Sequence, residues 1–229
     1  MTPFFRQGGT IAERISQIRQ SLPDSVRLIA VTKQVSIAAM REAYNAGIRD
    51  FAESRIQEAE VKQAQLQDFS DITWHLIGHL QSNKAQKALE QFQWIHSIDS
   101  LKLAQRLDKL AESVTKKPQV LLQVKILPDP NKYGWEIFDL LKDLAELNQC
   151  ASLNIRGLMT ILPLGLSSSE SFDVFKQVKE LATRISQQNC SHIQMEQLSM
   201  GMSDDYEPAV QAGATMVRLG RILFGDREV

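Results

Sequence analysis

The stretch Arg27-Leu28-Ile29-Ala30-Val31-Thr32-Lys33, followed closely by Ser36-Ile37-Ala38-Ala39, decides the fold. A short apolar run followed by a serine and a helical pattern predicts a buried strand, a loop and a helix. Lys33 then stands at the carboxyl end of the strand. Burying an unpaired ammonium is costly and favours loss of its proton. A neutral amine at the mouth of a parallel sheet is the group that Schiff-base chemistry requires.

The same strand–helix unit recurs along the whole chain. Strand-like apolar runs occupy residues 27–32, 48–52, 72–77, 94–98, 120–126, 155–161, 195–200 and 216–219. Helix-period segments occupy residues 37–46, 55–67, 83–90, 101–113, 135–147, 170–188 and 205–212, and an amphipathic stretch at residues 11–22 precedes them all. Eight such units without a long linker predict an α/β fold, a single (β/α)8 TIM-type barrel with an additional N-terminal helix. We expect residues 10–229 to form this one domain and residues 1–9 to be a flexible tail.

The composition of the chain argues against several classes of binding partner. The 229 residues carry a net charge of −1, so there is no overall basic field of the kind that nucleic-acid binding needs. No apolar run reaches the roughly 18 residues that span a bilayer, and the first residues are too few and too polar for a secretory signal. Cys150 and Cys190 lack any zinc-type spacing, and we expect both to be free thiols. These features predict a cytoplasmic protein without nucleic-acid or membrane partners.

In a barrel of this type, functional groups belong at the carboxyl ends of the strands. Barrel phosphate sites often lie between the loops after strands seven and eight. Here Ser199 offers a hydroxyl, Gly201 permits close backbone approach, and Gly220 and Arg221 present N–H groups from the neighbouring loop. The alternative is that Gly201 only forms a turn and that Ser203 only caps the following helix.

Arg218 and the histidines leave several interpretations open. Arg218 lies within an apolar strand, so it either forms a structural ion pair, with Glu196 or Glu53, or donates to a ring nitrogen of a ligand. His75 and His79 would be about 13 Å apart on a strand and cannot share a metal there. His79, beside Gly78, is a candidate to face a ligand, and His75 is expected to be satisfied in the core. His96 and His192 are expected to be structural or at the surface.

Several motifs together resemble one family. They are the segments 30–33, 74–84, 157–160, 198–204 and 217–220, which read AVTK, WHLIGHLQSNK, GLMT, LSMGMSD and VRLG. They resemble the pyridoxal phosphate homeostasis proteins, single-domain relatives of the alanine racemase barrel. The resemblance extends from about Ile11 to Gly225.

The resemblance implies a covalent cofactor site. Lys33 would form the internal aldimine with pyridoxal phosphate, Ser199 and the amides around Gly220 and Arg221 would hold the phosphate, and Arg218 would face the pyridine nitrogen. The remaining residues expected near the cofactor are Ser54, His79, Met159, Met200 and Gly201. Ser54 stands where the family usually has asparagine, so a hydroxyl replaces the amide that approaches the cofactor in the family.

The sequence is compatible with three functions. The leading one is a protein that holds the cofactor reversibly on Lys33, delivers it to pyridoxal-phosphate-dependent apoenzymes and influences amino-acid and keto-acid balance without strong catalysis. An arginine at the ring nitrogen favours this view, because it leaves a weaker electron sink than an acidic partner would. The alternative is an amino-acid racemase, which by family resemblance needs a further β domain. The chain stops after strand eight, so we do not expect that domain. Without a dimer built on it, we expect a monomer. The third is a Schiff-base aldolase-type barrel that acts on a sugar phosphate.

Overall fold

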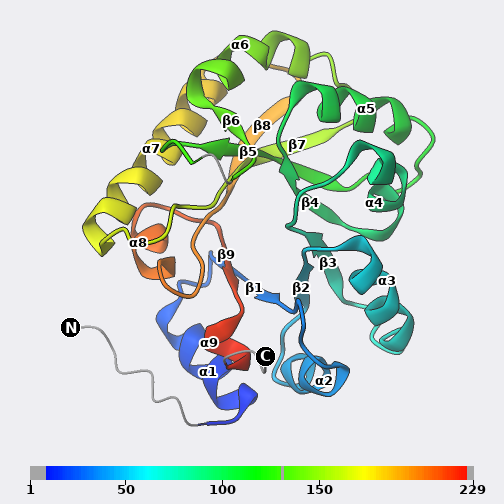
Figure 1. The fold of residues 1–229 in the computed structure, drawn as a ribbon, viewed down its shortest axis with the longest axis vertical. Coiled ribbons are helices and arrows are strands. Elements are labelled where there is room, and N and C mark those ends of the chain that lie inside the picture. The colour runs from blue at the N-terminus through cyan, green and yellow to red at the C-terminus, as the bar shows by residue number, and fades with distance from the viewer. Residues whose placement is uncertain (1–8, 130–131, 226–229) are drawn as a thin grey trace.

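The computed structural model describes residues 9–129 and 132–225. Its strands are β1 (Arg27–Val31), β2 (Asp50–Glu53), β3 (Thr73–Leu76), β4 (Trp94–Ile98), β5 (Gln119–Lys125), β6 (Trp135–Glu136), β7 (Asn154–Thr160), β8 (Ile193–Ser199) and β9 (Met216–Leu219). They pair in the order β4-β3-β2-β1-β9-β8-β7-β5-β6, and a further β4–β5 pairing closes the ring. All pairings are parallel, and β6 is a short addition beside β5. The predicted eight-stranded parallel barrel is confirmed (Figure 1).

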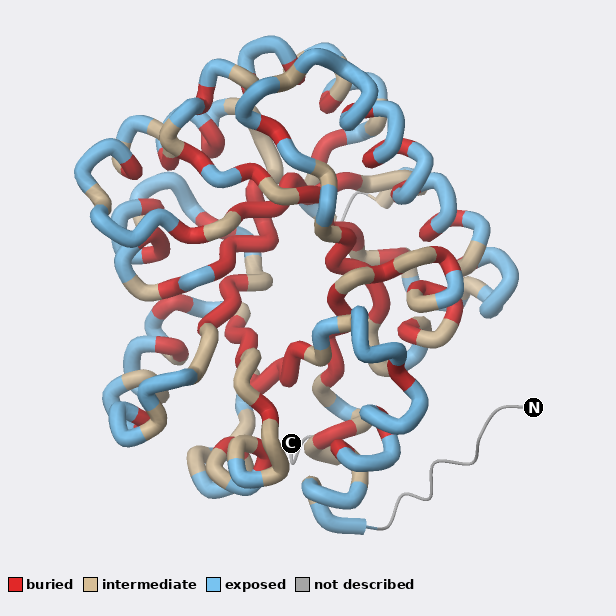
Figure 2. The backbone as a smooth tube through the Cα atoms, turned by 180° about the vertical axis from the view of Figure 1, so that it is seen from behind, coloured by how far each residue is buried: buried red, intermediate tan, exposed pale blue. Residues whose placement is uncertain are grey.

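Helices surround this barrel. They are α1 (Ile11–Ser21), α2 (Ile37–Asn45), α3 (Ile56–Gln65), α4 (Ala85–Gln91), α5 (Leu101–Ala111), α6 (Ile137–Leu147), α7 (Ser168–Ser186), α8 (Tyr206–Gln211) and α9 (Arg221–Phe224), with a 3₁₀ turn η1 (Ser82–Lys84). The expected N-terminal helix is α1, which starts at a capping box made by Thr10 and Glu13 and packs against α2 and α9. The buried parts of the chain form the central ring, and the exposed parts lie on its helical rim (Figure 2).

Side chains alternate between the barrel interior and the layer under the helices, as the period of a strand requires. On β1, Ile29 and Val31 belong to a small apolar cluster within the barrel, whereas Ala30 packs in the larger core under the helices. The interior cluster consists of Ile29, Val31, Ala52, Trp94, Leu121, Met159 and Met216. Polar side chains share this interior with the cluster, which matters for the site.

Three local details differ from the expected elements. Trp135 begins no helix, because it pairs with Val124 as β6, and α6 starts after it. Helix α8 starts at Tyr206 with Asp205 as its N-cap, so Ser203 is not the cap. The Asp205 carboxylate instead accepts from the Met202 amide at 2.6 Å, which closes a turn before the helix. The chain after β9 forms the short helix α9 rather than a loop.

Other expectations concern the ends, the thiols and the membrane. Residues 1–8 of the expected tail, and 226–229 of the expected domain, lie outside the described residues. Cys150 and Cys190 are free thiols, and burial raises the pKa of Cys150 to about 11. In the part of the chain that the structure describes, no helix combines the length and apolarity that crossing a membrane requires.

Candidate functional site

A cavity of about 790 Å³ opens at the carboxyl ends of the barrel strands. Its walls combine apolar side chains with basic and polar groups from the loops. The polar lining comprises Lys33, Ser54, His79, Gln123, Lys132, Tyr133, Ser203, Asp204, Arg218 and Arg221. A pocket of this size, largely apolar with a few convergent polar groups, is typical of a small-molecule or cofactor site.

Lys33 reaches this cavity because of its place on β1. It continues the face of Ile29 and Val31 that points into the barrel, two residues beyond the strand. Gln34 then adopts a left-handed backbone (φ 60°), and the Val35 amide donates to the Thr32 carbonyl at 2.9 Å. This tight turn ends the strand and leaves the half-buried Lys33 at the cavity wall.

A buried polar group supports the strand ends next to Lys33. Glu53 is fully buried, and its Oε1 accepts from Lys62 Nζ at 2.8 Å and from Thr32 Oγ1 at 2.6 Å. Burial raises the pKa of Glu53, while the Lys62 and Thr32 hydrogen bonds oppose that rise. Because Lys62 also donates to the Thr32 carbonyl at 2.6 Å, it joins the ends of β1 and β2 directly before Lys33 and Ser54.

His79 forms part of the cavity wall after β3. Its Nδ1 lies 2.8 Å from Asp99 Oδ2, and its ring stacks on Tyr133 with ring centres 3.6 Å apart. A carboxylate can only accept, so Nδ1–H donates to Asp99 and Nε2 is the ring nitrogen left for the cavity side. Gly78, just before it, permits close packing of the loops, because a Cβ there would lie 2.1 Å from the Ser54 carbonyl oxygen.

The loops after β8 and β9 meet at one side of the cavity. The Ile222 amide, in the first turn of α9, donates to Ser203 Oγ at 3.4 Å. Gly220 is the N-cap of α9, and Arg221, the first residue of the helix, forms an ion pair with Asp204. N–H groups at the start of a helix point away from it, so the Gly220 and Arg221 amides at this meeting point can donate to an anion. It is also where barrels of this type bind phosphate.

Arg218 forms the floor of the cavity. It is 2% exposed, with Nη1 donating to Ser199 Oγ at 2.7 Å and Nη2 to the Thr160 carbonyl at 2.8 Å. Burial lowers the pKa of Arg218 to about 10, and Asp205 opposes this shift through space, so the guanidinium stays positive at neutral pH.

Of the two alternatives for Arg218, the structural ion pair with Glu196 or Glu53 is wrong. Glu196 pairs with Arg156, and Glu53 pairs with Lys62. Both carboxylates are therefore engaged elsewhere, and Arg218 is held by neutral oxygens.

The structure brings six of the ten predicted site residues to the cavity lining: Lys33, Ser54, His79, Arg218, Gly220 and Arg221. Met159, Ser199, Met200 and Gly201 do not line it. Met159 and Ser199 point into the barrel below the floor, and Met200, one residue further, packs under the helices. Gly201 has φ +94° and meets α8, where a Cβ would lie 2.7 Å from that of Ala209.

Sequence reasoning gave Ser203 only a capping role and missed its place in the lining. The alternation of side chains along a strand could have indicated this. Ser199 is the last residue of β8, so its hydroxyl points inward, whereas Ser203 lies in the loop that reaches α9. Lys132 was also missed, and it donates to the Leu162 carbonyl at 2.5 Å. Nothing in its polar segment distinguishes it from a surface lysine.

Comparison with known proteins places this chain in a family. The model of the alanine racemase N-terminal domain matches residues 8–228. The pyridoxal phosphate homeostasis protein of Synechocystis is 57% identical over 212 residues, which cover 93% of this chain and 96% of that protein. The Escherichia coli protein of the same name is 34% identical, with 95% and 97% covered. The chain belongs to the pyridoxal phosphate homeostasis protein family.

Solved structures agree with this membership. PipY of Synechococcus elongatus, solved with pyridoxal phosphate bound, matches with a TM-score of 0.90 at 50% identity, covering 94% of this chain and 100% of PipY. An alanine racemase of Clostridium difficile matches with a TM-score of 0.76 at 16% identity, and this chain covers 60% of it. The second match shows a shared barrel fold.

Proposed function

We propose that this protein binds pyridoxal phosphate covalently but reversibly through Lys33, and that it holds and releases the cofactor rather than turning over a substrate. One observation carries the proposal: the Lys33 side chain, the loop donors around Ser203 and α9, and the Arg218 floor all line a single cavity. The name of the Synechocystis relative and the cofactor bound to PipY support it.

The residues present fit the chemistry of this cofactor. When bound, pyridoxal phosphate supplies an aldehyde that joins an amine with loss of water, together with a phosphate and a pyridine nitrogen. Lys33 provides the amine. Ser203 and the N–H groups of Gly220 and Arg221 would hold the phosphate, and Arg218 would offer its remaining N–H donors to the ring nitrogen.

The side chains that line the cavity favour an anionic ligand. Lys33, Lys132, Arg218 and Arg221 carry basic groups, whereas Asp204 is the carboxylate of the lining and is paired with Arg221. An excess of basic groups in a partly enclosed cavity attracts a phosphorylated ligand. We place the phosphate at Ser203 rather than at Ser199, because Ser199 is fully buried below the floor.

Covalent binding of the cofactor through Lys33 has a direct spectroscopic test. The wild-type protein incubated with pyridoxal phosphate should absorb visible light, since an imine conjugated to the ring is coloured. Lys33→Ala should lose this absorbance, whereas Lys132→Ala, a matched lysine of the same cavity, should keep it. A colourless wild type, or equal absorbance in wild type and Lys33→Ala, contradicts the proposal.

Racemase activity is the alternative function. His79, oriented by Asp99, and Tyr133 are the groups of the lining that could act as a second acid or base. We expect no appreciable turnover of L- or D-alanine, because an arginine at the ring nitrogen makes a weak electron sink. Racemisation with kcat of about 1 s⁻¹ or more would favour the enzyme instead.

A further inference from the structure

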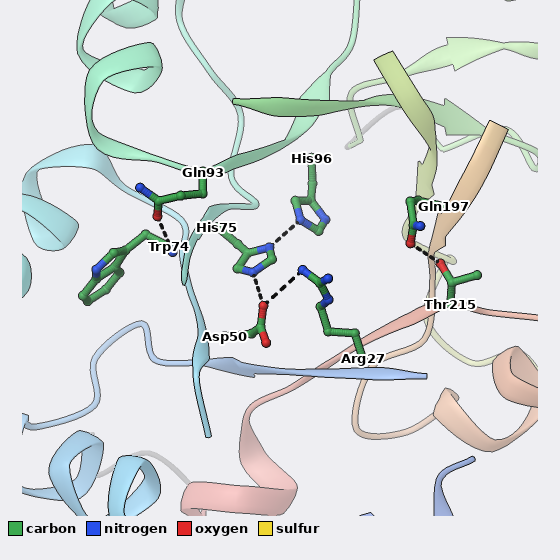
Figure 3. Close-up of polar contacts among 8 residues, drawn as sticks. All are labelled: Arg27, Asp50, Trp74, His75, Gln93, His96, Gln197 and Thr215. Carbon is green, nitrogen blue, oxygen red and sulfur yellow. Dashed lines mark hydrogen bonds and ion pairs between the residues drawn. The ribbon is translucent and has the colours of Figure 1, made fainter. Parts of the chain in front are cut away.

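A continuous line of hydrogen bonds crosses the barrel interior beneath the cavity. Asp50 Oδ1 lies 2.9 Å from His75 Nε2, His75 Nδ1 lies 2.9 Å from His96 Nε2, and His96 Nδ1 lies 2.8 Å from Ser199 Oγ. Arg218 Nη1 then donates to the same Ser199 oxygen at 2.7 Å. We call Asp50, His75, His96, Ser199 and Arg218 the interior relay. Figure 3 shows its first part, from Asp50 through His75 to His96, with Arg27 reaching the same Asp50 oxygen as His75.

The interior relay connects the two ends of the barrel. Asp50 is the first residue of β2, at the amino-terminal end of the strands, and is half-buried next to Arg27. His75, His96 and Ser199 are fully buried, and Arg218 opens onto the cavity at the other end. Every ring nitrogen of the two histidines is occupied by a neighbour in the line. These imidazoles are therefore part of a hydrogen-bond network and not only of the packed interior.

The hydrogen-bond directions follow from the Asp50 end. Arg27 Nη1 can only donate, and it lies 3.3 Å from the Asp50 oxygen that His75 also reaches, so this oxygen is an acceptor. His75 must then donate through Nε2–H. Burial lowers the pKa of His75 and holds that of His96 well below its ordinary value, and Arg218, Arg27 and the neighbouring imidazole act in the same sense on His96. Both rings are neutral, so each carries one proton.

The remaining directions follow from that single proton. With Nε2 protonated, Nδ1 of His75 accepts, and it accepts from Nε2–H of His96. Nδ1 of His96 is then also an acceptor, and its donor is the Ser199 hydroxyl. The lone pairs of Ser199 Oγ are left to accept from Arg218. Reversing the line would place a bare His75 nitrogen against the Asp50 carboxylate oxygen.

The line explains how a buried guanidinium is held without a close carboxylate. Within residues 9–129 and 132–225, the guanidinium of Arg218 donates only to Ser199 and to the Thr160 carbonyl, and Asp205 acts on it from a distance. Aligned hydrogen bonds polarise one another in a low-dielectric interior. Here every donor points from Arg218 toward the negative charge of Asp50, so the Ser199 oxygen becomes a better acceptor for the guanidinium.

We propose that His75 and His96 are positioning residues, which in their neutral Nε2–H tautomers fix the Ser199 hydroxyl as an acceptor for Arg218 and so orient the guanidinium edge that faces the cavity. The tautomers depend only on the folded chain. Their effect on the ligand rests on the proposed function, in which that edge faces the pyridine nitrogen.

The first test uses the protein without cofactor. Nitrogen-15 NMR of the full chain at pH 7 reports which nitrogen of each imidazole carries the proton. We expect His75 and His96 to be protonated at Nε2 and bare at Nδ1, and we expect Asp50→Asn, at the far end of the line, to populate the second tautomer of His75. Protonation at Nδ1 of either ring in the wild type, or an imidazolium, overturns the proposal whatever the cofactor does.

The second test measures the effect at the cavity. Ser199→Ala removes the acceptor of Arg218, and we expect its affinity for pyridoxal phosphate to fall about tenfold, with a shifted absorption maximum. Ser199→Thr keeps the hydroxyl and should restore both, and Leu121→Met controls for repacking of the interior. Unchanged affinity and spectrum in Ser199→Ala overturn the positioning role. A colourless wild type contradicts the proposed function and leaves the NMR result to decide on the tautomers.

Discussion

At the scale of single residues, the site depends on a few backbone positions that have little freedom. Lys33 faces the cavity because β1 alternates strictly and because Gln34 accepts a left-handed backbone immediately afterwards. A non-glycine residue with positive φ carries local strain that the surrounding structure must hold in place. The place of Lys33 at the cavity could be predicted from the sequence, whereas this turn could not, because glutamine has no particular preference for it.

Gly78 gives a prediction of stability. In Gly78→Ala the added Cβ would lie 2.1 Å from the Ser54 carbonyl oxygen, so the ends of β2 and β3 must move apart. We expect the free energy of unfolding in urea to fall by about 1–3 kcal/mol. Gly220→Ala is the control for stability, since its Cβ would lie 3.4 Å from the nearest atom, the Val31 carbonyl oxygen. Equal losses of unfolding free energy in the two variants would show that the close approach at Gly78 does not affect stability.

The buried imidazoles give a prediction of pH dependence. Burial lowers the pKa of His75 and His96 in the folded chain, while in the unfolded chain each binds a proton below its ordinary pKa of about 6.5. The unfolded state then binds more protons, so stability falls as the pH drops below that value, by up to about 1.4 kcal/mol per pH unit for an imidazole that stays neutral in the folded chain.

A variant isolates this effect. Glu53, whose pKa is raised by burial, acts in the opposite sense, so the comparison to make is wild type against His96→Gln, in which Glu53 contributes equally. The free energy of unfolding of the wild type should fall more steeply between pH 7 and pH 5 than that of His96→Gln. Parallel pH curves for the two proteins would mean that His96 takes up a proton in the folded state.

At the scale of elements, the spacing of apolar residues predicted the strands and helices, whereas the geometry of the loops could not be predicted. The strands and helices followed from alternating apolar segments, and the site that we propose for the phosphate, between the last two strand loops, followed from the barrel. The choice between Ser199 and Ser203 did not, since it depends on the residue at which β8 ends. The hydrogen bond between His96 and Ser199 joins positions 103 apart in sequence, and no local pattern indicates such a pairing.

The contact between two loops gives a prediction at this scale. Ser203→Ala removes the hydroxyl that accepts from the Ile222 amide and that we place against the phosphate. We expect affinity for pyridoxal phosphate to fall about tenfold, the loss of one hydrogen bond to a charged group, with little change in stability. Ser113→Ala, which removes an exposed hydroxyl bonded to the Leu110 carbonyl, is the control. Calorimetric titration that gives the same affinity for both variants would place the phosphate elsewhere.

At the scale of the whole molecule, the closed ring of strands determines what can meet at its mouth. The pairing of β1 with β9 brings loops from both ends of the chain to one cavity, so Lys33 and Arg218 line the same space despite their separation in sequence. The barrel itself could be predicted, because eight similar units in one chain leave few other architectures. The interior relay could not, because barrel interiors are expected to be apolar and its residues come from five strands.

The assembly state is a prediction of the same scale. We expect a monomer, because Lys33, Ser203, Arg218 and Arg221, which we propose to hold the cofactor, all belong to one chain and can act together without a second copy. Light scattering on a sizing column should give a mass near 25.9 kDa, with and without pyridoxal phosphate. A stable mass of twice that value would contradict the expectation.

The central claim is that Lys33 is the covalent attachment point of the cofactor. The most direct measurement is borohydride reduction of the protein loaded with pyridoxal phosphate, followed by proteolysis and peptide mass spectrometry. The account predicts one modified lysine, Lys33, with Lys62 and Lys132 unmodified. A stable adduct on another lysine, or no adduct on Lys33, would contradict it.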